Sequence, residues 1–77
     1  MVFPSLGAKK LMRILKKKPL QYRVVSQAGS HRKLESRNGY PDIEFAYHDK
    51  DTIPPGLVRR VLCDRVGLSE EEAKDLI

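Results

Sequence analysis

A change of hydrophobic period at Pro19 most constrains what this chain can fold into. Before this residue, apolar side chains recur at helical spacing, which predicts an amphipathic helix over residues 7–18. We expect Ser5 to cap the start of this helix and Pro19 to stop it. The apolar face comprises Ala8, Leu11, Ile14 and Leu15, with Met12 at its edge. A helix of this kind packs its apolar face against another layer of structure.

Beyond Pro19, apolar and polar residues alternate with the period of two that is typical of strands. We expect strands over residues 20–26, 30–36 and 42–48. The segment Gln27-Ala28-Gly29 predicts a turn between the first two strands. Asn38-Gly39 is a strong signal for a two-residue hairpin turn between the second and the third. The three strands are therefore expected to form an antiparallel sheet.

The last part of the chain predicts two further helices. Pro55 suits the first turn of a helix over residues 55–66. Ser69 and Glu72 form a capping box at the start of a short final helix. The length allows one domain, residues 1–77, with one small core. The expected fold class is α+β, in the order α-β-β-β-α-α, with the helices on one face of a three-stranded antiparallel sheet and the other face open.

Composition and charge narrow the functional classes. The single cysteine excludes an intramolecular disulfide and any zinc site built on cysteine pairs. No apolar run approaches the ~20 residues of a membrane span, and the N-terminus lacks the apolar core of a secretory signal, so we expect a cytoplasmic protein. Residues 1–41 carry ten basic residues and one acidic residue, whereas residues 42–77 carry five basic and nine acidic residues. A strongly basic half favours a polyanionic partner, most often nucleic acid.

The outer face of the first predicted helix is wholly basic. It comprises Lys9, Lys10, Arg13, Lys16 and Lys17. A charged helix face is commonly no more than a solvated surface. In a basic chain the same face can also follow the phosphate backbone of RNA, and we take these five residues as candidate RNA ligands.

Gly29-Ser30-His31 stands at the expected start of the second strand. Histidine titrates near neutral pH and suits proton transfer in RNA cleavage, where the 2′-OH of the substrate is the nucleophile. Arg23, Arg32 and Lys33 lie close in strand order and could neutralise the phosphate. We expect Ser30 to bond the backbone or the phosphate rather than to act as a nucleophile, because no His/Asp relay is spaced to activate it.

Five segments occur in a recognisable order along the chain. They are Lys10-Leu11-Met12-Arg13-Ile14-Leu15, Tyr22-Arg23-Val24-Val25, Gly29-Ser30-His31, Phe45-Ala46-Tyr47-His48 and Gly56-Leu57-Val58-Arg59-Arg60-Val61-Leu62. The ordered set resembles the HicA family of toxins, with departures at Pro19-Leu20, where the family usually has glycine, and at Ala46, where it often has proline. The resemblance implies a fold like that of a double-stranded-RNA-binding domain, cleavage of messenger RNA without metal or cofactor, and a HicB-type antitoxin as partner. It also implies that His31 is catalytic.

Strand alternation predicts where the two histidines lie. Leu34 must face the core, so His31, three residues before it, faces the open side of the sheet. The expected tight turn after the second strand would pair Leu34 with Ile43. The same register pairs His31 with Ala46, although a register shifted by two would preserve these faces. His48 would share the open face, diagonal to His31 and with its side chain within roughly 10 Å, as a general acid or merely as a substrate contact or strand cap.

Other residues give weaker signals. His48 with Asp49 and Asp51 is a weak pattern for a metal site, and we expect no metal. Cys63 lacks basic neighbours of the catalytic kind, and we expect an ordinary thiol. Two functions stay open beside a ribonuclease, namely a non-catalytic RNA-binding module and a small adaptor whose basic helix binds an acidic protein. Only cleavage requires the histidine at position 31, and the salt dependence of RNA affinity separates the RNA binder from the adaptor.

Overall fold

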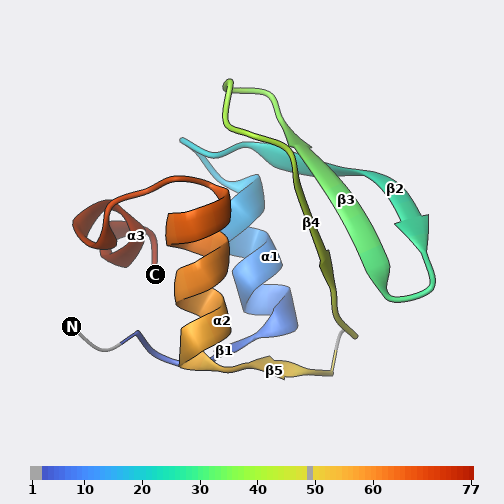
Figure 1. The fold of residues 1–77 in the computed structure, drawn as a ribbon, viewed down its shortest axis with the longest axis horizontal. Coiled ribbons are helices and arrows are strands. Elements are labelled where there is room, and N and C mark those ends of the chain that lie inside the picture. The colour runs from blue at the N-terminus through green and yellow to red at the C-terminus, as the bar shows by residue number, and fades with distance from the viewer. Residues whose placement is uncertain (1–2, 49) are drawn as a thin grey trace.

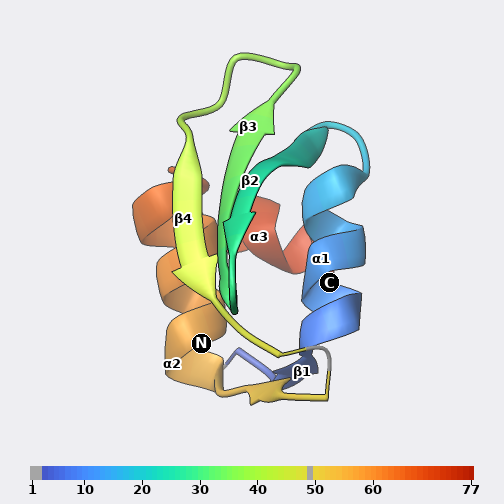
Figure 2. The same cartoon turned by 90° about the vertical axis from the view of Figure 1, so that its right-hand side faces the viewer.

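The structure, a computed structural model, describes residues 3–48 and 50–77 of the chain. Its main elements are α1 (Ala8–Lys16), β2 (Tyr22–Ala28), β3 (His31–Ser36), β4 (Ile43–Ala46), α2 (Pro55–Arg59), the π-helical segment η1 (Arg60–Arg65) and α3 (Glu70–Leu76). The three strands form an antiparallel sheet in the order β2-β3-β4. The helices cover one face of this sheet (Figure 1, Figure 2). The predicted α+β class, like that of a double-stranded-RNA-binding domain, is confirmed.

A second, two-stranded sheet was outside the sequence prediction. Strand β1 (Leu6–Gly7) pairs antiparallel with β5 (Thr52–Ile53). The amide of Ala8 continues this ladder by donating to the carbonyl of Asp51 at 2.9 Å. The predicted Ser5 cap is wrong, because a glycine stands at the cap position and the pairing with β5 satisfies the start of the helix instead. The small sheet joins the start of α1 to the segment before α2 (Figure 2).

Two helices differ from their predicted extent. Helix α1 ends at Lys16, two residues before its predicted end. The helix expected over residues 55–66 is α-helical only as far as Arg59 and then continues in the wider π geometry. The amide of Val66 accordingly donates to the carbonyl of Val61, five residues back, at 3.0 Å. Hydrophobic spacing places the apolar stripe of this helix correctly but does not distinguish the two hydrogen-bond patterns.

The core lies between the sheet and the helices. Its largest fully buried side chains are Leu11, Leu15, Leu20, Leu34, Val58 and Leu62. The whole apolar face predicted for α1 is buried, and the capping box predicted for α3 is present. Leu34 is the contribution of β3 to this core, and its burial decides which face of the strand looks towards the helices.

The turn between β2 and β3 lies later in the chain than predicted. Ala28 already pairs with His31, so the connection consists of Gly29 and Ser30 rather than residues 27–29. Gly29 has a φ of 60°, a backbone conformation that residues with a side chain rarely adopt. Its place at the first position of a two-residue turn matches the preference of tight hairpins for glycine there. As a result, His31 opens β3 directly after the turn.

The connection between β3 and β4 is longer than a tight hairpin but keeps the predicted register. Residues 37–42 separate the two strands, so the two-residue turn is wrong. Leu34 nevertheless pairs with Ile43, and both side chains are buried. His31 pairs with Ala46, and both are exposed. The predicted pairs and the predicted faces are thereby confirmed.

Tyr22 ties the start of β2 to this connection. Its side chain is buried, and its hydroxyl donates to the carbonyl of Pro41 at 2.6 Å. Burial, followed by the charge of Asp42, raises the pKa of Tyr22 to about 12. We expect Tyr22→Phe to lower the free energy of unfolding by about 1 kcal/mol at neutral pH, because the hydrogen bond is lost.

The pH dependence of this contribution follows from the raised pKa. An unfolded tyrosine has a pKa of about 10, so the stabilisation by neutral Tyr22 is complete below that pH. It is lost as the pH rises towards the pKa of about 12 in the folded protein. Urea denaturation of wild type and Tyr22→Phe at neutral and alkaline pH measures the effect. The difference in unfolding free energy should shrink at alkaline pH, and an unchanged difference would contradict this role.

Candidate nucleic-acid interface

The Gly29-Ser30-His31 segment forms the tip of the β2–β3 hairpin. His31 is the first residue of β3 and its side chain is exposed. Its cross-strand neighbours are Ala28 on β2 and Ala46 on β4. Two alanines leave the imidazole without bulky neighbours in the ladder, so this position of the open sheet face can accommodate a large substrate group.

The open face of β3 places a cation beside His31. Lys33 lies two residues further along the strand and therefore on the same face. It is exposed and pairs with Ser26 and Glu44. Arg23 also belongs to this face, because it pairs with Glu35, one residue beyond the buried Leu34. Of the cations predicted near His31, these two share its side of the sheet.

Arg32 lies on the other face, towards the helices. It pairs with Phe45 and is only half-exposed. Its Nη1 donates to the carbonyl of Tyr47 at 2.7 Å, and its Cζ lies 3.9 Å from the centroid of the Tyr47 ring. That ring in turn stacks on Phe45, with the centroids 5.0 Å apart. The structure thus separates Arg32 from Lys33, although the two are adjacent in sequence.

His48 lies two residues beyond the end of β4 and is exposed. Its amide donates to Oδ2 of Asp51 at 2.8 Å, and its carbonyl accepts from the amide of Asp51 at 2.9 Å. The residue before it, Tyr47, donates its amide to the carbonyl of Ser30 at 3.0 Å. His48 is therefore connected to the His31 hairpin through the backbone of a single intervening residue. The predicted separation of the two imidazoles stays a prediction.

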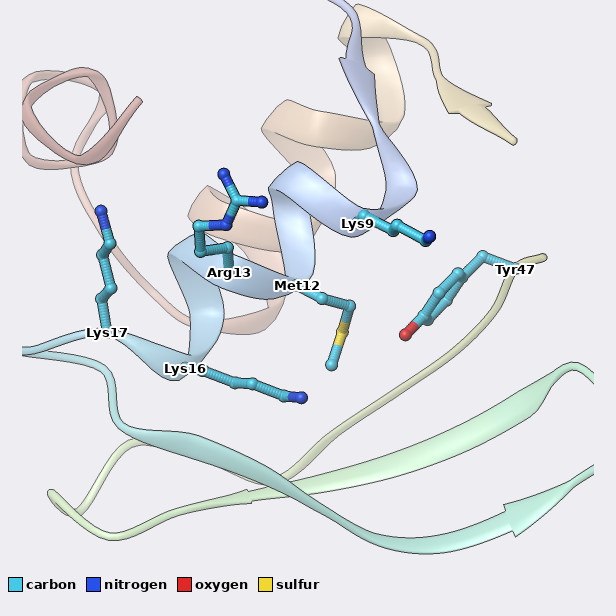
Figure 3. Close-up of a pocket in the computed structure, with 6 residues that line it drawn as sticks. All are labelled: Lys9, Met12, Arg13, Lys16, Lys17 and Tyr47. Atoms are coloured by element: carbon cyan, nitrogen blue, oxygen red, sulfur yellow. The ribbon is translucent and has the colours of Figure 1, made fainter. Parts of the chain in front are cut away.

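A groove of about 440 Å³ lies between α1 and Tyr47. It is lined by Lys9, Met12, Arg13, Lys16, Lys17 and Tyr47. In Figure 3, Lys9, Met12 and Lys16 extend from the helix towards Tyr47, whose hydroxyl points towards the ends of Met12 and Lys16. Four of the five candidate cations of α1 line this groove, whereas Lys10 is exposed outside it. The backbone of Tyr47, which lines this groove, is bonded to Ser30 and Arg32, the two residues that flank His31 in sequence.

A second hollow, of about 460 Å³, extends the basic surface along β2. It is lined by Lys16, Gln21, Tyr22, Arg23, Val24 and Arg37. Lys16 borders both hollows and so makes them neighbours. Sequence reasoning missed Arg37 and Tyr47 as members of this surface. Arg37 stands in a turn without a motif, and Tyr47 was assigned only to the core by alternation.

No metal site is found among residues 3–48 and 50–77, since no three His, Cys, Asp or Glu side chains gather there. Asp49, part of the alternative metal pattern, lies outside the described residues. Cys63 is half-buried against the core, and burial raises the pKa of its thiol despite the opposing charge of Arg59. A raised pKa lowers the reactive thiolate fraction at neutral pH, which agrees with an ordinary thiol. Among the described residues, every helix is too short to form a membrane span.

Comparison with known proteins gives one match. The family model HicA_toxin, described as the HicA toxin of bacterial toxin-antitoxin, matches residues 8–68. The searches of curated proteins and of solved structures returned no match. The matched range begins with α1, contains the Gly29-Ser30-His31 hairpin, and ends just beyond η1. Because this range is well over half of the 77 residues, the chain belongs to the HicA toxin family, and its partner is the antitoxin of a toxin–antitoxin pair.

Proposed function

We propose that this toxin is a metal-independent endoribonuclease that cleaves messenger RNA, with His31 as general base. The observation that carries the proposal is the place of His31. It is an exposed histidine at a hairpin tip, between two alanines, and both residues that flank it are bonded to Tyr47, which lines a basic groove. The cytoplasm, where messenger RNA is found, is the corresponding compartment.

The chemistry requires three groups. His31 removes the proton from the 2′-OH, whose oxygen attacks the adjacent phosphorus. Lys33, on the same strand face, neutralises the charge that develops on the phosphoryl oxygens. The 5′-oxygen leaves with a proton, for which His48 is the candidate donor. The products are one RNA end with a 2′,3′-cyclic phosphate and another with a 5′-hydroxyl, so that no water and no metal enters this step.

The basic groove supplies the affinity for RNA in this proposal. Lys9, Arg13, Lys16 and Lys17 present positive charge along one side of α1. Contacts of this type bind the phosphate backbone without reading its sequence and weaken as salt rises. Lys10 and Arg23 add charge outside the groove, and Ser30 is a candidate to contact the phosphate at the hairpin. The RNA would therefore run from α1 to the open face of the sheet past Tyr47.

The central test is His31→Ala. We expect cleavage of a long RNA to fall by at least ~100-fold, because general base catalysis contributes 10²–10⁴-fold. RNA affinity and the circular dichroism spectrum should be retained, since the side chain is exposed and outside the core. Lys74→Ala, which removes a cation on α3, is the matched control and should cleave like wild type. Equal cleavage by wild type and His31→Ala would refute His31 as the general base. RNA binding without cleavage by wild type would leave the alternative of a non-catalytic RNA-binding module.

Metal independence has its own test. We expect cleavage to continue at an undiminished rate in excess EDTA, because each proton transfer is assigned to a side chain. The RNA ends should carry 2′,3′-cyclic phosphate and 5′-hydroxyl groups, which end-specific ligation and kinase assays detect. Loss of activity in EDTA with recovery on addition of magnesium or manganese would revive a metal mechanism.

The antitoxin is proposed to be an acidic protein of the HicB type that covers His31 and part of the basic face of α1. Residues 1–41 have a net charge of +9, from ten basic residues and one acidic residue. Electrostatic attraction of this size accelerates encounter with an acidic partner. Covering the hairpin would silence the toxin by excluding RNA.

Association kinetics test this surface. We expect the association rate of toxin and antitoxin to fall by about tenfold or more from low to high salt, whereas dissociation changes little. Lys9→Gln with Lys16→Gln should reduce both the rate at low salt and its salt dependence. Stopped-flow fluorescence measures the rates. Lys74→Gln, which removes one positive charge from α3, serves as the control and is compared with each single Lys→Gln variant on α1. A rate that does not respond to salt would place the antitoxin on another surface.

A further inference from the structure

The peptide group between Tyr47 and His48 is held at both ends. Its carbonyl oxygen accepts from Nη1 of Arg32 at 2.7 Å, and its N–H donates to Oδ2 of Asp51 at 2.8 Å. A cation thus bonds the oxygen and a carboxylate bonds the N–H, and charge-assisted bonds are stronger than neutral ones. This peptide plane contains the N and Cα atoms of His48, so its orientation, together with the φ angle of His48, sets the direction in which the side chain leaves the backbone.

The guanidinium of Arg32 is well placed to act on this peptide. It stands over the ring of Tyr47, at 3.9 Å from the centroid, in the geometry of a cation–π contact. The Tyr47 ring is fixed by its stacking on Phe45 and by its burial. Planar stacking and a directed N–H bond are properties of arginine that lysine does not share. Arg32 therefore meets both the ring and the backbone of the same residue.

The contacts of Tyr47 also reach both neighbours of His31 in sequence. Its amide donates to the carbonyl of Ser30 at 3.0 Å, and its carbonyl accepts from Arg32. The residues directly before and after His31 thus bind the residue directly before His48. Since strand alternation turns Arg32 away from the open face, its side chain acts from behind the sheet while His31 faces the substrate side.

We propose that Arg32 is a positioning residue that fixes His48 relative to His31 through the Tyr47–His48 peptide, and not a ligand of RNA phosphate. Asp51 completes the clamp from the N–H side of the same peptide. The inference rests on the proposed ribonuclease function, in which His48 protonates the leaving oxygen. Two adjacent cations then have different roles, because Lys33 contacts the phosphate whereas Arg32 positions His48.

Arg32→Gln and Lys33→Gln form a matched pair, because each removes one positive charge from adjacent positions of β3. For Arg32→Gln we expect kcat to fall about tenfold, with little change in KM and in the salt dependence of RNA affinity. For Lys33→Gln we expect weaker RNA binding and a slope of log affinity against log salt that is smaller by about 1. A loss of one unit in the salt slope for Arg32→Gln would show a phosphate ligand and overturn the proposal.

A double-mutant cycle with His48→Ala tests the route of action. If Arg32 acts through His48, Arg32→Gln causes no further loss of kcat once His48 is alanine. Losses of kcat that multiply in the double mutant would overturn the proposal. Full activity of His48→Ala would also overturn it, but would not contradict the role of His31. Arg32→Lys keeps the charge and one donor but not the planar stacking, so we expect it to recover only part of kcat. If Arg32→Gln does not fold, Arg32→Lys takes its place in the cycle.

Amide hydrogen exchange provides a readout that does not depend on activity. In the RNA-free protein we expect the His48 amide to exchange about fivefold faster in Arg32→Gln than in wild type. Release of the Tyr47 carbonyl lets the shared peptide turn, which weakens the bond of its N–H to Asp51. Amides within α1 should be unchanged and report on the global fold. Unchanged exchange at His48 would overturn the clamp even in an active enzyme. A wild-type protein without ribonuclease activity would instead refute the proposed function, while the exchange data still decide whether Arg32 fixes His48.

Discussion

The burial of Leu34 is the constraint on which the arrangement of the site depends. Its side chain has no exposed area, and it pairs with Ile43 on β4, which is also buried. Because side chains alternate along a strand, this burial turns His31 and Lys33 to the open face. A shift of β3 by one residue would exchange the two faces and remove Leu34 from the core. The free energy of core packing thereby enforces the exposure of the proposed catalytic histidine.

The basic surface, in contrast to the burial of Leu34, lowers the stability of the fold. Four cations stand on the outer face of α1 and Lys17 follows its last residue, whereas its first turn contains no acidic residue. Like charges at neighbouring positions of a helix repel and cost stability. Burial of the apolar face of α1 offsets the free-energy cost of this repulsion. Packing of the apolar face therefore stabilises the helix, while the exposed face carries the positive charge. A polyanion bound in the groove would relieve the repulsion, which is the thermodynamic counterpart of its affinity.

Local rules predicted the order of elements and the faces of β3, but not the contacts between distant segments. The pairing of β1 with β5 joins residues 6–7 to residues 52–53, and neither segment has a strand pattern long enough to detect. Hydrophobic spacing also does not distinguish the π geometry of η1 from an α-helix. Strand alternation alone predicts the face on which Arg32 lies, because the alternation that exposes His31 turns the next residue towards the helices. Its contact with Tyr47 required the structure, because it depends on the end of another strand.

The β3–β4 register shows why a prediction can succeed although its turn is wrong. The sum of paired residue numbers depends on the midpoint of a connection, and not on how many residues around that midpoint are unpaired. Unzipping a two-residue turn at Asn38-Gly39 symmetrically leaves Leu34 opposite Ile43. Backbone groups in the wider connection bond to β2 and to the residue before it. The hydroxyl of Tyr22 donates to the carbonyl of Pro41, and the amide of Arg37 donates to the carbonyl of Gln21. The wider connection thus exchanges hairpin bonds for contacts with β2, while the position of His31 opposite Ala46 is unaffected.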